Sequence, residues 1–371
     1  MPRSIAEVNA IRRSNRNPAE TSGPGQPSGG AHGRHGFDPN QPRAPAGHHD
    51  GGQWTDSVGT AGPAAPNREV VLDDSGEEAW ESVTSTYRPD GTLAEQEVLN
   101  RDGSRIHSQF SRDPRIAGWD ERHTVVAADG TTLTFETSGD AQTIYDAAGR
   151  PISAAVWTED GAEPLPLVQP AFLPAIPPAI ATFELALVLL AWLSTRNGRN
   201  STAVFSSRLR QYEPDSNKEL KATWVGSLTD SELKKVCDKF DNVQDNTNEA
   251  ADATDRAMYE TAAAYGTEVH AKLEQKIKVQ KNPNFRAEVS LLKTLAETGE
   301  APELEISRGR KGSVRVDVLE NTKNGTVCVY DIKTGKSGLY PGRSAEIART
   351  VRLRYPNAQR ILMIEVRPRQ K

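Results

Sequence analysis

Two aspartates and a lysine occupy two neighbouring segments near the C-terminal end of this 371-residue chain. Asp317 lies in the segment SVRVDVLE, whereas Asp331 and Lys333 lie two residues apart in TVCVYDIKT. Both segments alternate like strands, and residues two apart in a strand share a face, so Asp331 and Lys333 are predicted to project together. Asn324-Gly325 between the segments predicts a hairpin turn. The hairpin would bring Asp317 close to the other two side chains.

These residue types suit the hydrolysis of a phosphodiester. Such a reaction uses a hard cation held by oxygen ligands while water attacks phosphorus in line. Asp317, Asp331 and the main-chain carbonyl of Ile332 can supply those oxygens. Lys333 can position or help to deprotonate the attacking water and can offset charge that develops on the phosphate. The expected cofactor is Mg²⁺, with Mn²⁺ as the alternative.

A helical pattern from about Thr254 to Val279 precedes these strands and contains GTEVHAKLE. His270 and Glu274 are four residues apart, which places them on one face of a helix. Glu274 is predicted to complete the metal shell or to orient a water, and His270 could add a nitrogen ligand. Taken singly, each of these residues is better explained as an ordinary turn residue or surface charge. Their combination in this order favours a catalytic site.

The segments GTEVHAKLE, RVDV and YDIKTG resemble the successive motifs of the RecB-like branch of the PD-(D/E)xK nuclease superfamily, over residues 255–371. The resemblance implies an α/β, restriction-endonuclease-like fold, in which helices flank a central mixed sheet. It also implies metal-dependent cleavage of DNA, with the metal at Glu274, Asp317 and Asp331 and with Lys333 as the catalytic lysine. The same region resembles C-terminal nuclease domains of bacterial polymorphic toxins and prophage proteins.

A further helix is predicted over about residues 342–355, followed by a final strand over 361–368. This helix lacks the glutamine that the RecB-like branch often carries there, which puts exonuclease-style handling of a strand in doubt. Its arginines could contact phosphates or could form a solvated basic face. They are Arg343, Arg349, Arg352 and Arg354.

The charge of the chain is distributed unevenly. Residues 266–371 hold 21 Lys and Arg against 12 Asp and Glu, a net charge of +9, whereas the whole chain carries −5. A basic domain suits a polyanionic ligand, because neutralising phosphates supplies most non-specific affinity for nucleic acid. DNA is the expected partner. RNA remains an alternative, since nothing in the predicted metal site distinguishes the two sugars.

The residues before this domain predict three further regions. Residues 1–67 are rich in Gly, Pro, Asn and Ser without apolar periodicity and predict a disordered leader. Residues 68–157 alternate short β-type runs with Asp-Gly turns, which predicts β-hairpins and weakly resembles the YD repeats of Rhs-type proteins. Residues 195–253 are predicted to be a linker with a short helix that begins at the capping box of Thr229–Glu232.

Residues 164–194 are the most apolar stretch. Only 16 residues follow its last proline, and Glu184 lies among them, so the stretch is short for a helix that spans a membrane. A helix buried in a domain or a partner is favoured over membrane insertion, and a role in translocation is the alternative if the protein is a delivered toxin.

Cys237 and Cys328 are the two cysteines, and neither belongs to a CxxC pair. They predict neither a disulfide framework nor a structural zinc site, so the folded part is expected to lack covalent cross-links. Met1–Asn17 carries arginines but no apolar core behind them, so no signal peptide is expected. The protein is therefore expected to be made in the cytoplasm. Export or delivery to another cell as a toxin stays open, as does the existence of a neighbouring immunity protein.

The favoured hypothesis is a metal-dependent DNA endonuclease that acts as a toxin effector or a prophage nuclease. One alternative is a non-catalytic module that binds nucleic acid, against which the intact set of four residues argues. The other is a structural or attachment component of a phage or secretion particle, in which the β-rich region is the functional part.

Overall fold

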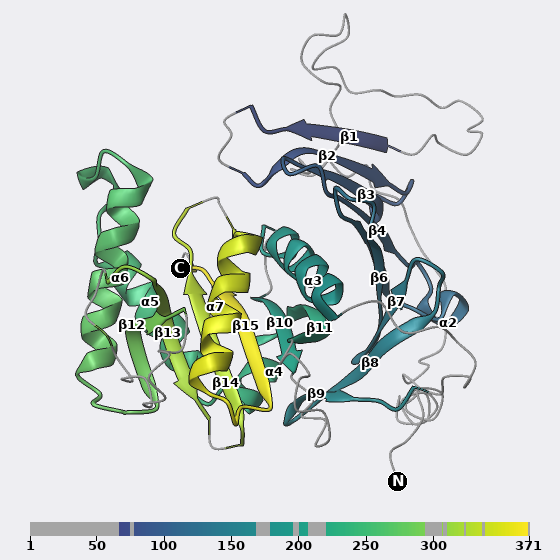
Figure 1. The fold of residues 1–371 in the computed structure, drawn as a ribbon. Coiled ribbons are helices and arrows are strands. Elements are labelled where there is room, and N and C mark those ends of the chain that lie inside the picture. Colours follow the sequence, from purple (N-terminus) through teal and green to yellow (C-terminus); the bar gives the residue numbers. More distant parts are fainter. Residues whose placement is uncertain are drawn as a thin grey trace, which may run out of the picture. The chain divides into compact units, whose positions relative to one another are not determined.

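A computed structural model describes residues 67–74, 78–167, 179–195, 200–206, 220–293, 306, 310–322, 324–335 and 338–369. The predicted leader therefore lies outside the described residues, except for Asn67. The described residues all belong to one compact unit. They form a nine-stranded sheet, a six-stranded sheet and the helices that pack on the second sheet (Figure 1).

The first sheet is a meander in which consecutive strands pair antiparallel from β1 to β9. Its turns use the Asp-Gly pairs of the sequence: Gly103 and Gly130 have φ of +83° and +86°, a conformation that glycine adopts at little cost. The prediction of β-hairpins in this region is thus confirmed. The strands are β1 Asn67–Leu72, β2 Trp80–Tyr87, β3 Leu93–Asn100, β4 Arg105–Phe110, β5 Glu121–Val126, β6 Thr132–Ser138, β7 Ala141–Asp146, β8 Pro151–Thr158 and β9 Gly161–Pro164, with the short helix α2 Pro114–Ala117 before β5.

The second sheet has the order β11-β10-β15-β14-β13-β12. All neighbours are antiparallel except β14 and β15, which are parallel and are connected through helix α7. The strands are β10 Asn200–Ser206, β11 Lys221–Leu228, β12 Phe285–Leu292, β13 Ser313–Asn321, β14 Thr326–Ile332 and β15 Arg360–Val366. β14 is buried along its whole length, as expected for a central strand covered on both faces.

Helices cover both faces of this sheet (Figure 1). Helices α3 (Ala179–Leu193) and α7 (Pro341–Arg354) bury apolar side chains such as Leu187 and Ile347 against one face. Helices α4 (Asp230–Val236), α5 (Phe240–Asp252) and α6 (Ala262–Lys278) bury a second core against the other face, with a 3-10 turn at Arg256–Met258 before α6. The sheet therefore separates two apolar cores.

The predicted linker over residues 195–253 is wrong. This segment contains β10 and β11, two strands of the six-stranded sheet, together with helices α4 and α5. Polar residues such as Ser201 and Thr202 are buried in β10, so the pattern of apolar residues that marks a strand is weak there. The capping box at Thr229 and Glu232 is confirmed, but its helix ends at Val236.

The predicted start of the long helix at Thr254 is also wrong. Asp255 instead caps the 3-10 turn by accepting a hydrogen bond from the backbone N–H of Ala257, and α6 begins only at Ala262. Thr261 caps α6, since its side chain accepts a hydrogen bond from the backbone N–H of Ala264. A second capping residue seven positions after Thr254 thus shortens the helix that the apolar spacing predicted.

The apolar stretch, described over residues 164–167 and 179–194, contains the expected helix in its second described part. Helix α3 has 15 residues and contributes Leu187, Leu189 and Leu190 to the core of the domain. Glu184 is exposed and forms an ion pair with Arg349 of α7, with 3.3 Å between Oε1 of Glu184 and Nη2 of Arg349. Among the helices of the described residues, none has the length and apolar character needed to cross a membrane.

The expectation that the fold lacks covalent cross-links is wrong, because Cys237 and Cys328 form a disulfide. The bond connects the C-terminal end of α4 to β14, and both cysteines are fully buried. The two residues are 91 positions apart in the sequence, so only the packing of α4 on the sheet brings them together. Closing a loop of this length restricts the unfolded chain and contributes about 4–5 kcal/mol in the loop-entropy model.

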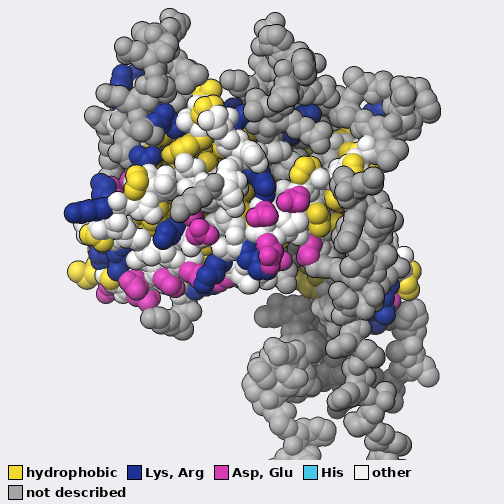
Figure 2. Space-filling model, turned by 90° about the horizontal axis from the view of Figure 1, so that it is seen from below, with side chains coloured by type: hydrophobic (Ala, Val, Ile, Leu, Met, Phe, Trp, Pro, Cys, Tyr) yellow, Lys and Arg dark blue, Asp and Glu magenta, His cyan; other side chains and the backbone are white. Residues whose placement is uncertain are grey.

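One face of the molecule is shown in Figure 2. Acidic and basic side chains are interspersed over its described part, and no patch of one sign covers that part.

Candidate active site

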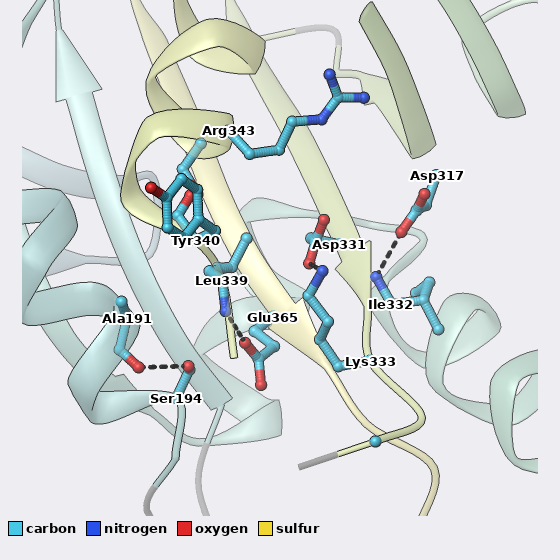
Figure 3. Close-up of polar contacts among 12 residues, drawn as sticks. Ala191, Ser194, Asp317, Asp331, Ile332, Lys333, Leu339, Tyr340, Arg343 and Glu365 are labelled. Carbon is cyan, nitrogen blue, oxygen red and sulfur yellow. Dashed lines mark hydrogen bonds and ion pairs between the residues drawn. The ribbon is translucent and has the colours of Figure 1, made fainter. Parts of the chain in front are cut away.

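Asp317 and Asp331 lie at the point where β13 and β14 separate. The two strands pair from Asn321 opposite Val327 to Val318 opposite Tyr330, and the pairing stops there. Asp317 then reaches across the gap, where its Oδ2 accepts a hydrogen bond of 2.8 Å from the backbone N–H of Ile332 (Figure 3). The fork between the strands thus places an aspartate carboxylate against the strand that carries Asp331 and Lys333.

Glu288 on β12 is held in an unusual backbone conformation beside this fork. Its φ is +54°, in the left-handed region that non-glycine residues rarely adopt. Before Glu288 the buried residue Ala287 belongs to the core under α4–α6, whereas after it Val289 belongs to the core under α3 and α7. The strand therefore changes faces at Glu288. Backbone strain of this kind persists where surrounding contacts enforce it, and it is frequent at functional sites.

The imidazole of His270, on α6, joins these residues into one cluster. Its Nδ1 lies 3.4 Å from Oε1 of Glu288 and 3.6 Å from Oδ1 of Asp317. Its Nε2 lies 3.2 Å from the carbonyl oxygen of Ile332. One potential ligand atom from each of His270, Glu288 and Asp317 lies within 4.8 Å of the others.

A glycine allows α6 to approach the residues that follow β14. A Cβ atom on Gly266 would lie 2.8 Å from Oγ1 of Thr334, which is shorter than real Cβ contacts allow. The glycine of GTEVHAKLE and the threonine of DIKTG are therefore in close contact. His270 follows one helical turn after Gly266, which carries its ring to the fork.

The charges of this cluster are coupled. Burial and the neighbouring carboxylate of Asp331 raise the pKa of Asp317 to about 6, although His270 and Lys333 oppose that shift. Burial disfavours the charged form of His270, but the hydrogen bond to Glu288 and the negative charge of Asp317 outweigh it and raise the pKa of His270. The raised pKa of Asp317 reflects burial and repulsion between negative charges. A divalent cation bound there would offset both costs and stabilise the ionised carboxylates.

Lys333 forms an ion pair with Asp331, with Nζ 2.7 Å from Oδ2 (Figure 3). Burial lowers the pKa of Lys333, but the carboxylate of Asp331 more than compensates, and the net shift is upward. The lysine is therefore a cation at neutral pH. In this state it is a hydrogen-bond donor and a counter-charge rather than a general base.

Glu365 lies next to this pair, directly opposite Asp331 in the pairing of β14 with β15. It is 3% exposed, and burial raises its pKa, with Arg367 opposing the shift. Its Oε2 accepts a hydrogen bond of 2.9 Å from the backbone N–H of Leu339. Glu365 thus attaches the residues before α7 to β15, beside Asp331 of β14 (Figure 3).

The structure does not bring Glu274 into the cluster. Glu274 forms an ion pair with Lys278 at 2.6 Å, one helical turn further along α6. Among the described residues, the cluster of ligand atoms draws its second carboxylate from Glu288 and not from Glu274. Nothing in the sequence of β12 distinguished Glu288, because it falls at an ordinary polar position of the strand and its φ cannot be inferred from residue type.

The four predicted arginines have different environments. Arg352 is buried and donates to the carbonyl oxygens of Pro356 and Ala358, so its role is structural and the prediction of phosphate contact is wrong for it. Arg349 is exposed and lies over the ring of Phe183. Arg343 is half-buried and donates to the carbonyl oxygen of Arg315 on β13 at 3.0 Å (Figure 3). Arg354 is half-buried at the last position of α7.

The ligand set fits a divalent cation. Mg²⁺ binds oxygen at about 2.1 Å, so neighbouring ligands around one ion lie about 3 Å apart. The separations of 3.4 and 3.6 Å from Nδ1 of His270 to Oε1 of Glu288 and Oδ1 of Asp317 are close to that spacing, whereas the Ile332 carbonyl oxygen lies against the other ring nitrogen, Nε2. A nitrogen ligand beside carboxylates also suits Mn²⁺.

The chain was compared with models of protein families, with curated proteins and with solved structures, and none of the three comparisons gave a match. The function is therefore inferred from the site alone.

Proposed function

We propose that this protein is a metal-dependent nuclease that hydrolyses phosphodiester bonds of DNA, with the cleavage mode of an endonuclease. The observation that carries the proposal is the meeting of His270, Asp317 and the Ile332 carbonyl at the fork that also holds the Asp331–Lys333 pair. Hydrolysis of a phosphodiester needs these two components, an oxygen-rich cation site and an adjacent fixed positive charge.

The order of the elements supports the assignment to a RecB-like PD-(D/E)xK nuclease. Helix α6 is followed by β12, β13, β14, α7 and β15, and β15 lies parallel to β14. The motif residues occur in the helix, on the second strand and on the third strand of this series. This is the order that the resemblance of the sequence implied.

The residues of the site have separate roles in the proposed reaction. Asp317, Asp331 and the Ile332 carbonyl would hold Mg²⁺ or Mn²⁺, and Glu288 and Nδ1 of His270, which lie beside Asp317, would add ligands or orient a metal-bound water. A bound cation would lower the pKa of water and polarise the phosphate. Lys333, charged and fixed by Asp331, donates a hydrogen bond to the phosphate oxygens as negative charge develops on them.

The setting that we propose is a delivered toxin effector or a prophage nuclease, with an immunity protein as a partner in the first case. The β-meander that precedes the α/β part is in keeping with a carrier or packaging segment. The buried disulfide also favours passage through an oxidising compartment, because such bonds are rare in proteins that stay in a reducing cytosol.

Cleavage by the full-length chain tests the proposal. Supercoiled plasmid, linear duplex, single-stranded DNA and RNA are each incubated with Mg²⁺, Mn²⁺ or EDTA. We expect nicking and linearisation of plasmid with either metal and none with EDTA. The RNA lane decides between DNA and RNA as the substrate.

Two variants make the test specific to the site. Asp331→Asn removes a metal ligand and the partner of Lys333, and Asp129→Asn changes an exposed aspartate in a turn of the meander. We expect the first to abolish cleavage and the second to retain it. Absence of cleavage by wild-type protein, or equal cleavage by both variants, would overturn the proposed activity and leave non-catalytic binding of nucleic acid as the better interpretation.

A further inference from the structure

Arg315 lies on β13 two residues before Asp317, beside the candidate site. Its guanidinium forms an ion pair with Glu288, with Nε 2.9 Å from Oε2. The other oxygen of the same carboxylate, Oε1, lies 3.4 Å from Nδ1 of His270. A single buried carboxylate thus separates the guanidinium from the group of potential cation ligands formed by His270, Glu288 and Asp317.

Arg315 is held in place at its backbone and at its side chain. Its backbone lies opposite Ser290 of β12, and its carbonyl oxygen accepts a hydrogen bond of 3.0 Å from Nη2 of Arg343. Figure 3 shows Arg343 extending from the start of α7 toward the side of the fork that carries Asp317. The side chain is fixed by Glu288, which is itself 3% exposed. A group that is positioned before its ligand arrives loses little conformational entropy on binding.

The outer nitrogens of Arg315 are open to a ligand. Its side chain is 41% exposed, and Nη1 and Nη2 form no hydrogen bond with any described residue. Arg122 of the meander differs, because its Nε and Nη2 both donate to Glu136. A guanidinium presents its N–H groups as a planar fork that matches two oxygens of a phosphate. Arg315 therefore has an open pair of donors that suits a phosphate.

The charges at the fork favour an anionic ligand once a divalent cation is bound. Among the described residues that meet there, three ionised carboxylates carry −3, and Lys333 and Arg315 carry +2, which leaves −1. A divalent cation changes this sum to +1 when His270 is neutral, the form in which histidine binds a metal. One phosphodiester group, with a single negative charge, then neutralises the site. The three carboxylates belong to Glu288, Asp317 and Asp331.

We propose that Arg315 binds a backbone phosphate of the substrate through Nη1 and Nη2, next to the cation site. The contact is made to oxygens that are already charged in the bound substrate, whereas Lys333 acts on charge that develops during the reaction. Phosphates occur at every step of a strand, so the contact contributes affinity and register but no preference for sequence. The inference rests on the proposed nuclease function.

The dependence of DNA binding on salt tests this assignment. The full-length chain in EDTA is titrated with a fluorescein-labelled duplex over roughly 50–200 mM NaCl. Counterions are released in proportion to the phosphates that a protein neutralises. Loss of one contact therefore lowers the slope of the logarithm of the binding constant against that of the salt concentration by about 0.9. For Arg315→Gln we expect this change of slope and roughly 10- to 100-fold weaker binding, equal for duplexes of unrelated sequence.

Three further variants separate phosphate binding from a structural role. Arg315→Lys keeps the charge and should retain the slope. Arg122→Gln is the matched control and should change neither slope nor affinity, because Arg122 is 36% exposed and pairs with Glu136 on the neighbouring strand. The double variant Arg315→Gln, Glu288→Gln leaves no unpaired charge at the ion pair and should lose the same slope, so it replaces Arg315→Gln if that variant is unstable. Equal melting temperatures verify that the variants are folded.

Steady-state kinetics give a second readout. The phosphate charge that Arg315 contacts is present in the bound substrate, so its loss weakens substrate and transition state alike. Arg315→Gln should therefore raise KM by roughly 10- to 100-fold and leave kcat nearly unchanged.

The outcomes separate this proposal from the proposed nuclease function. Cleavage of DNA by the wild type with an unchanged slope in Arg315→Gln would overturn the phosphate contact and leave the nuclease intact, and weaker binding at that unchanged slope would assign Arg315 a structural role through Glu288. A lower slope in Arg315→Gln but not in Arg122→Gln, in a protein that cleaves nothing, would support the phosphate contact and overturn catalysis. Absence of DNA binding by the wild type would overturn the contact as well.

Discussion

The side-chain amide of Gln142 forms two hydrogen bonds with the backbone of Val225, 83 residues away in the sequence. Its Nε2 donates to the carbonyl oxygen at 2.6 Å, and its Oε1 accepts from the N–H at 2.8 Å. Val225 belongs to β11, which is the outer strand of the six-stranded sheet, and Gln142 belongs to the meander. A residue of the β-rich region therefore pairs with backbone groups on the outer edge of the sheet that carries the candidate site.

Replacement of Gln142 should destabilise the fold. Gln142 is 1% exposed, so Gln142→Leu leaves the N–H and carbonyl of Val225 buried without this partner. We expect a loss of roughly 2–4 kcal/mol in the free energy of unfolding, since each orphaned group costs about 1–3 kcal/mol. Urea denaturation measures it, with Gln109→Leu on the same sheet as a half-exposed control. Equal stability of the two variants would show that the meander does not support the second sheet.

Metal binding should distinguish Glu288 from Glu274. Oε1 of Glu288 lies 3.4 Å from Nδ1 of His270 and its Oε2 lies 2.9 Å from Nε of Arg315, whereas Glu274 pairs with Lys278 on its own helix. Glu288→Gln should therefore weaken binding of Mn²⁺ by roughly 10- to 100-fold, as for residues that orient metal ligands. Glu274→Gln should change the affinity less than 2-fold, by about 0.4 kcal/mol or less. Calorimetric titration measures the dissociation constant of Mn²⁺ for each variant. A larger loss of affinity in Glu274→Gln than in Glu288→Gln would identify Glu274 as the second carboxylate ligand.

Removal of the lysine charge should slow cleavage without preventing substrate binding. The pKa of Lys333 is raised, so its role depends on the positive charge and not on proton abstraction. Lys333→Met should reduce kcat by roughly 10²- to 10³-fold, the typical effect of losing one group that stabilises developing negative charge. Lys333→Arg should recover part of the rate. A Met variant with unchanged kcat would exclude Lys333 from the chemical step.

Reduction of the disulfide should lower stability. The bond between Cys237 and Cys328 closes a long loop, and its loss should cost roughly 3–5 kcal/mol in the free energy of unfolding. Urea denaturation with and without dithiothreitol measures the difference. The double variant Cys237→Ala, Cys328→Ala should be insensitive to the reductant and should unfold at a lower urea concentration than the oxidised wild type. Coincident curves for all three samples would contradict a stabilising role.

Asp146 should contribute stability that is lost in acid. Burial raises its pKa, but hydrogen bonds from Arg150 and from the backbone N–H of Ala148 outweigh burial and lower it. A carboxylate with a lowered pKa stabilises the fold at pH values above its pKa in the unfolded chain, about 4, and this contribution disappears as the pH falls through the folded value. Asp146→Asn should therefore lose roughly 1–3 kcal/mol at pH 7 and show a weaker decline in stability below pH 4. Urea denaturation at a series of pH values measures the stability of both proteins. The same loss of stability in acid for wild type and variant would assign that loss to groups other than Asp146.

Local patterns in the sequence predicted the parts of the fold that local interactions determine. The alternation in SVRVDVLE and TVCVYDIKT, with Asn324-Gly325 between them, predicted the β13–β14 hairpin, and the Asp-Gly pairs predicted turns of the meander. The residues of Thr229–Glu232 predicted a helix start that the structure contains. Such signals depend on side-chain period and on backbone preferences within a few residues, so a single segment carries them.

The other features of the fold depend on interactions between segments that are distant in the sequence. The disulfide, the membership of β10 and β11 in the sheet and the bonds between Gln142 and Val225 all join residues that are separated in the sequence. Asp317, Asp331 and Lys333 could be named from residue type and spacing. The position of Glu288 beside His270 and Asp317 could not, because Glu288 has a φ of +54° at the point where β12 passes from one core to the other. Residue types therefore predicted a kind of chemistry, whereas tertiary packing determined which carboxylates lie close together.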